Sequence, residues 1–124
     1  AALVIRERLV AAEPDRADYQ RDLSVSHERM GDIHGGAGSI EQAFAEYRAS
    51  LAIIERLVAA EPNRADYQRH LSVTLLRTAE YAGPEARTLL ERAAAIVDAL
   101  DATGRLAPSD RDLTDMISQL LGLA

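Results

Sequence analysis

Hydrophobic residues recur every three to four positions along most of the chain, which is the spacing of amphipathic helices. The longest such stripe runs from residue 40 to residue 58, and no segment shows the period-two alternation of a half-buried strand. Proline and glycine interrupt the helical pattern at Glu13-Pro14, at 35–38, at Glu61-Pro62, at Gly83-Pro84 and at 104–108. These signals predict an all-α fold of about six helices.

Polar residues near the expected helix starts predict how these helices are capped. The side-chain oxygen of a short N-cap residue accepts a hydrogen bond from an unpaired backbone N–H group of the first turn. An acid or an amide three residues later often accompanies it. Four such pairs precede helical patterns, namely Asp15/Asp18, Ser39/Gln42, Asn63/Asp66 and Ser109/Asp112. Pro84 is expected at a first helical position, where its missing N–H costs little.

The chain contains a near-exact internal repeat. Residues 3–26 align with residues 51–74, at an offset of 48, and 19 of the 24 positions are identical. From Gly83 onward the repeat continues only after a deletion of five residues, which aligns Ala43 with Ala86 and Ile54 with Val97. A period of this size is typical of stacked repeats, in which each unit buries its apolar face on a neighbour.

The repeat predicts the organisation of the chain as one repeat domain over residues 1–124. Residues 1–14 correspond to the end of a truncated repeat, 15–62 to a full repeat, 63–104 to a degenerate repeat and 105–124 to a terminal capping helix. Because the chain opens inside a repeat, we expect it to be a C-terminal fragment of a larger protein.

Composition narrows the possible functions. The formal net charge of −6 argues against sequence-independent binding of nucleic acid and against an anionic membrane surface. The chain has no cysteine and no apolar run long enough to span a membrane, which favours a cytoplasmic location. All 14 basic residues are arginine, which we interpret as the codon bias of a GC-rich bacterial genome.

Residues 24–62, read as an antiparallel helix pair, resemble a tetratricopeptide repeat. Gly31 matches the small residue of the first helix, and Ala43, Tyr47 and Ser50 match small, aromatic and small positions of the second. The 48-residue period is similar to a long-helix bacterial variant of this family, in which repeats often follow a signalling or effector domain. The resemblance implies an antiparallel helix-pair solenoid that acts as a protein–protein interaction scaffold.

The resemblance also implies where a partner would bind, on a concave face lined by the first helix of each pair. The corresponding positions are Val25, Glu28, Arg29 and Asp32, and, in the degenerate copy, Val73, Leu76, Arg77 and Glu80. The acids among them would form a patch for a basic peptide or protein segment, although charge pattern alone favours a solvated helix face. The Lys and Asn clamp with which some family members grip a C-terminal carboxylate is absent.

Other polar groups are better explained by structure than by chemistry. The glycines after His34 lack the Lys-Ser/Thr of a phosphate-binding loop and fit a helix-to-helix turn. His27 and His34 are expected to replace core aromatics rather than to bind metal, and His70 is expected to be exposed. Asp110, Asp112 and Asp115 lack the glycine and closing glutamate of a calcium loop and are expected in a first helical turn.

Three functions therefore compete on the sequence alone. The first is a protein-interaction module, without cofactor or metal. The second is a structural spacer or self-association element of a bacterial signalling or effector protein, forming a homodimer through the truncated first helix, whose Leu3, Ile5 and Leu9 lack cover. The third is an enzyme, which no motif supports, so we expect none.

Overall fold

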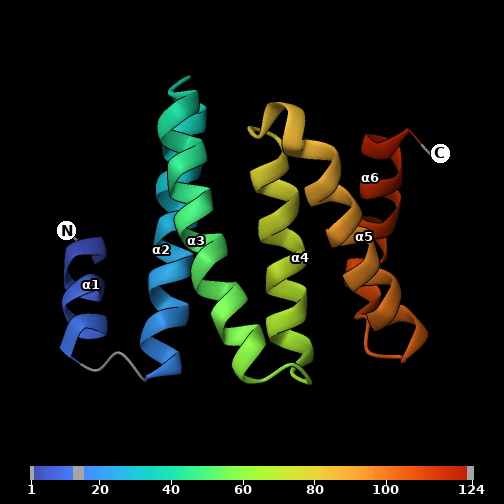
Figure 1. Ribbon diagram of the computed structural model, residues 1–124, viewed down its shortest axis with the longest axis horizontal. Coiled ribbons are helices and arrows are strands. Elements are labelled where there is room, and N and C mark those ends of the chain that lie inside the picture. Colours follow the sequence, from blue (N-terminus) through green and yellow to red (C-terminus); the bar gives the residue numbers. More distant parts are fainter. Residues whose placement is uncertain (1, 13–15, 123–124) are drawn as a thin grey trace. The chain divides into compact units, whose positions relative to one another are not determined.

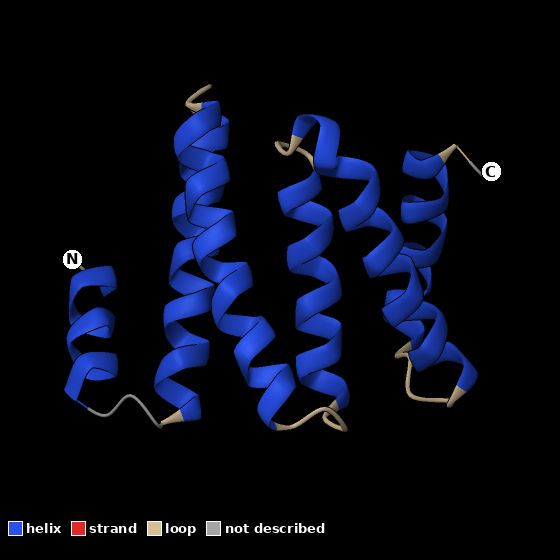
Figure 2. Ribbon diagram, in the orientation of Figure 1, coloured by secondary structure: helices blue, strands red, loops and turns tan. Residues whose placement is uncertain are grey.

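The structure of the protein, a computed structural model, describes residues 2–12 and 16–122, with side chains described at 3–9 and 16–122. Six α-helices form, and the described residues include no strand (Figure 2), which confirms the all-α prediction. Among the helices described, none is both long and apolar enough to cross a membrane.

The chain divides into two compact units, residues 1–61 and 62–124. The first unit consists of α1 (Ala2–Ala12), α2 (Ala17–Gly36) and α3 (Ile40–Ala60) (Figure 1). The second unit consists of α4 (Ala65–Ala79), the short 3₁₀ helix η1 (Gly83–Glu85), α5 (Ala86–Ala102), η2 (Pro108–Asp110) and α6 (Arg111–Leu121).

In the first unit, α2 and α3 form a long antiparallel pair, and α1 packs on α2. The turn between α2 and α3 requires glycine, since Gly38 has a φ of +79°, a conformation that strains other residues. The buried apolar residues of this unit are Leu23 of α2 and one stripe of α3, formed by Ala43, Tyr47, Leu51, Ile53, Ile54 and Leu57.

In the second unit, α5 packs against both α4 and α6. The buried apolar residues of this second unit follow the helical periodicity of α4, α5 and α6: Tyr67, Leu71, Leu75, Leu76, Ala79, Leu90, Ala93, Val97, Leu100, Ile117 and Leu121. An ion pair joins α4 to η2, because Arg69 Nε lies 2.6 Å from Asp110 Oδ2 and the Asp110 side chain is only 5% exposed. This hydrogen bond raises the pKa of Arg69.

The predicted helix caps are the main error at the level of local structure. The N-cap residue of α2 is Arg16 and that of α4 is Arg64, and neither helix has a side-chain cap. Each arginine instead binds the acid two residues later with a 2.6 Å contact, Arg16 to Asp18 and Arg64 to Asp66. Glu13, Pro14 and Asp15, which entered the prediction for α2, lie outside the described residues.

The same prediction fails in part at α3 and α6. Ser39 does occupy the N-cap of α3, but its side chain makes no capping hydrogen bond. At α6 the N-cap is Asp110 rather than Ser109, because 108–110 form a 3₁₀ turn and the Asp110 carboxylate is used by Arg69. Pro84, which was expected at a first helical position, is the second residue of η1, after Gly83.

One expectation about exposure is also wrong, and two apolar segments are less covered than their spacing suggests. His70 is 9% exposed, although the first copy has the exposed Asp22 at this position. Ile33 of α2 is 62% exposed, because it lies in the last turn before the glycines. On α6, Ile117 and Leu121 are covered whereas Met116 and Leu120 are exposed.

Candidate functional site

The α2 face of the first unit carries polar side chains that the neighbouring helix holds in place. The Tyr47 hydroxyl of α3 donates to Asp32 Oδ1 of α2, although the Tyr47 ring itself is buried. Five residues before Asp32, His27 Nδ1 lies 2.6 Å from Glu46 Oε2, with both side chains mostly covered. The positions of these groups on α2 therefore depend on the pairing with α3.

The helices α2 and α3 are closely packed against each other. A β-carbon added to Gly31 would lie 2.8 Å from Tyr47 Cε1, so only glycine allows the ring to lie where it does. Further along the pair the hydroxyls of Ser24 and Ser50 are 2.7 Å apart, and both residues are fully buried. Such small-residue contacts bring the two backbones together and leave few alternative packings.

The four partner-binding residues predicted on α2 are all at least partly accessible to solvent. Val25 and Glu28 are half-buried, whereas Arg29 and Asp32 are exposed. Glu28 and Asp32 are one helical turn apart and therefore face the same way. The structure thus places two carboxylates side by side on α2, with one of them held by Tyr47.

The four predicted positions on α4 differ in their accessibility. Arg77 and Glu80 are exposed and Val73 is half-buried, but Leu76 is only 5% exposed. Leu76 therefore belongs to the buried apolar set and offers little area to a partner. In this second unit the candidate surface reduces to Val73, Arg77 and Glu80.

The degenerate copy has lost the polar contacts that support the α2 face. At the repeat positions of His27 and Glu46 it has Leu75 and Leu89, and at that of Tyr47 it has Leu90. Leu75 and Leu90 are buried. Ser72, whose counterpart Ser24 bonds Ser50, donates instead to the backbone oxygen of Arg69 at 2.7 Å. The polar pair of His27 and Glu46 has thus been replaced by two leucines, and the acid held by a tyrosine hydroxyl occurs in the first unit.

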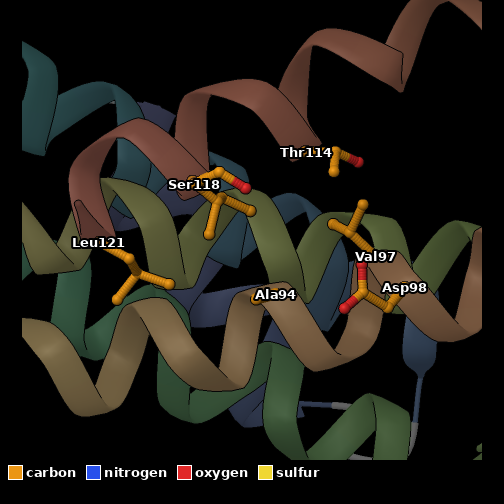
Figure 3. Close-up of a pocket in the computed structure, with 7 residues that line it drawn as sticks. Ala94, Val97, Asp98, Thr114, Ser118 and Leu121 are labelled. Atoms are coloured by element: carbon orange, nitrogen blue, oxygen red, sulfur yellow. The ribbon is translucent and has the colours of Figure 1, made fainter. Parts of the chain in front are cut away.

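A small cavity lies between α5 and α6 that sequence reasoning did not predict (Figure 3). We call it the α5–α6 slot; its volume is about 90 Å³. Its apolar wall is made by Val97, Ile117 and Leu121, and its polar lining by Asp98, Thr114 and Ser118, with Ala94 as the remaining lining residue. A sequence signal was available, because the repeat alignment places Ala94 where the other two copies have Leu3 and Leu51.

The groups that could suggest metal or phosphate binding have structural roles in the part of the chain that is described. Over 2–12 and 16–122, no group of three or more His, Cys, Asp or Glu side chains is arranged to hold a metal ion. The glycines that follow His34 form the turn between α2 and α3, where Ser39 N donates to His34 O at 2.8 Å. Asp110 is used in its ion pair with Arg69.

No protein family model, curated protein or solved structure matches the chain.

Proposed function

We propose that this chain is a protein-interaction module that binds a basic peptide or protein segment along α2. One observation carries the proposal: the Tyr47 hydroxyl holds the exposed Asp32 carboxylate beside Glu28 on a closely packed helix pair. A side chain fixed before binding loses less conformational freedom on binding than a free one. Two neighbouring carboxylates complement the ammonium or guanidinium groups of a partner.

The repeat supports the same function independently of charge. Near-identical helical segments 48 residues apart are what a tetratricopeptide-like solenoid of the long-helix bacterial type would contain. Solenoids of this kind present extended surfaces to other proteins. Under this proposal the α2 face is the partner surface of the intact copy, and Val73, Arg77 and Glu80 are its weaker counterpart in the degenerate copy.

The experiment is binding to an array of peptides of equal length and graded charge. We expect binding to rise with the number of basic residues and to fall in a Glu28→Ala/Asp32→Ala variant whose helix content by circular dichroism is unchanged. Tyr47→Phe, which keeps the ring but removes the hydroxyl, should weaken binding to a smaller extent. Binding that ignores peptide charge, or that the double variant leaves intact, contradicts the proposal.

A second candidate function, self-association through α1, rests on a different observation. Ile5 and Leu9 of α1 are 59% and 40% exposed, whereas their repeat counterparts Ile53 and Leu57 are 6% and 5% exposed. The same apolar face is therefore covered in one copy and open in the other, and a second copy of this chain offers helices of the right type to cover it.

The oligomeric state tests this second function. We expect the mass measured by sedimentation to rise with concentration, and Ile5→Glu/Leu9→Glu to restore the monomer. The matched control is Arg8→Glu, which makes the same change of net charge on α1 at a position that is exposed in both copies. A monomer at every concentration argues against self-association and leaves the basic-peptide proposal untouched.

A further inference from the structure

We propose that the α5–α6 slot binds a terminal alkylammonium group, as found in a lysine side chain or a small primary amine. The slot belongs to the second unit and shares no residue with the α2 face, so this inference goes beyond the proposed function. It rests on the origin of the slot, on its two kinds of wall and on the sign of its charge.

The slot exists because one large side chain is missing from the repeat. Leu3 and Leu51 hold this repeat position in the first two copies, and Ala94 holds it in the third. Leu51 is buried in α3. Ala94 is half-buried, and it lies on the wall of a cavity of about 90 Å³. The opening is therefore suited in size to one aliphatic side chain and too small for a drug-sized ligand.

Apolar and polar side chains both line the slot. Val97, Ile117 and Leu121 are 1%, 2% and 9% exposed and present only carbon. On α6, Thr114, Ile117, Ser118 and Leu121 follow the i, i+3, i+4, i+7 spacing of one helix face, which runs along the slot. Leu121 lies toward one end of the drawn residues, and Thr114 and Asp98 lie toward the other (Figure 3). An aliphatic chain along this face would bury its methylenes and bring its terminal group to the polar end.

The polar end favours a cation. Asp98 is exposed, and within the described residues its carboxylate has neither a hydrogen bond nor an ion pair. The Thr114 hydroxyl adds a possible acceptor at this end, whereas Ser118 is drawn closer to Leu121 (Figure 3). No basic side chain lines the slot. An ammonium group donates three hydrogen bonds and accepts none, so it matches this lining, whereas a carboxylate ligand would meet Asp98 with like charge.

The test is a methyl NMR titration with three probes of equal chain length: butylammonium, 1-butanol and butanoate, at constant ionic strength. We expect saturable shifts of the Val97, Ile117 and Leu121 methyl signals with butylammonium. Butanol should bind about threefold more weakly, the scale of one exposed ion pair. Butanoate should bind more weakly than butanol. The absence of saturable shifts, or equal affinity for butylammonium and butanol, overturns the proposal.

Variants locate the binding and its charge preference. Asp98→Asn should reduce the affinity for butylammonium to that for butanol, and the control Asp112→Asn, an exposed acid of α6 outside the slot, should not. Ala94→Leu restores the repeat residue and should abolish binding of both probes; Ala94→Val serves if the leucine variant does not fold. Binding that survives in a folded, filled variant lies elsewhere and overturns the proposal.

One further probe identifies the source of the ammonium group. Saturable shifts with Nα-acetyl-lysine N-methylamide support the proposal and assign the slot to a lysine side chain of a partner polypeptide. Binding of butylammonium without binding of the lysine derivative also supports it and assigns the slot to small free amines.

Discussion

Tyr47 lies against Gly31 so closely that a β-carbon on the glycine would be 2.8 Å from Cε1 of the ring. The ring is buried, and its hydroxyl reaches Asp32, the next residue after Gly31. The absence of a side chain at one position of α2 therefore determines where the following carboxylate is held. Packing and the candidate partner surface are linked at this contact.

Replacing this glycine tests the contact. Gly31→Ala should lower the free energy of unfolding by about 1–3 kcal/mol, because the new methyl group overpacks against the Tyr47 ring. The measurement is chemical denaturation followed by circular dichroism. Gly36→Ala is the matched control, since a β-carbon there would meet nothing within 4 Å. Equal effects of the two changes would mean that the ring does not lie against Gly31.

The polar pair between α2 and α3 has a natural control in the degenerate copy. His27→Leu or Glu46→Leu alone should destabilise by about 1–3 kcal/mol, because each leaves the other mostly covered polar group without its partner. The double change reproduces Leu75 and Leu89 of the second unit and should cost less than the sum of the single changes. Additive costs in this double-mutant cycle would show that the two side chains do not interact.

The ion pair between α4 and η2 should matter more than those on the surface. Arg69→Gln should lower the free energy of unfolding by about 1–3 kcal/mol, because the change leaves the covered Asp110 carboxylate without its cation. We expect a value toward the lower limit, since the Arg69 side chain is 53% exposed. Glu91→Gln breaks the exposed pair with Arg87 and should change stability by less than about 0.5 kcal/mol. Thermal unfolding of both variants under one set of conditions makes the comparison. A loss no larger for Arg69→Gln contradicts the structure of this unit.

The first turn of α2 should show a pH effect of predictable sign. The Arg16 guanidinium holds the pKa of Asp18 below its ordinary value of 3.8. A lowered pKa in the folded state means that the stabilisation is present above pH 3.8 and is lost as the pH falls through the folded pKa. Carboxyl NMR should report this lowered value and its return toward 3.8 in Arg16→Gln. A pKa of Asp18 that does not respond to this change excludes the pair in solution.

Periodicity in the sequence was sufficient to predict the helices but not how their ends are capped. Apolar spacing and the Gly and Pro signals depend on local geometry, so the existence and order of all six helices could be predicted. The caps depended on competition between partners: Asp18 binds Arg16, and Asp110 binds Arg69, which is 41 residues away. A pairing over such a distance in the sequence leaves no local pattern.

Some features of the candidate surfaces could also be predicted from the sequence, and others could not. The acids of α2 could be chosen from spacing, because residues one turn apart share a face whatever the fold. The burial of Leu76 and His70 could not, since it depends on which other helices cover α4. The α5–α6 slot is an intermediate case. The change from Leu51 to Ala94 is visible in the repeat, but only the structure shows that no other side chain fills the space.

The most direct test of the account is the affinity of one labelled basic peptide, chosen from the array, by fluorescence anisotropy. The comparison is between the unchanged chain, Glu28→Gln/Asp32→Asn, and a control, Glu41→Gln/Glu61→Gln. The control removes two exposed charges of the same unit that lie outside α2, one in the first turn of α3 and one at its C-cap. The account predicts at least about tenfold weaker binding for the α2 variant, the scale of two partly buried charge contacts, and little change for the control. Equal affinities for all three proteins would contradict the claim that α2 is the partner surface.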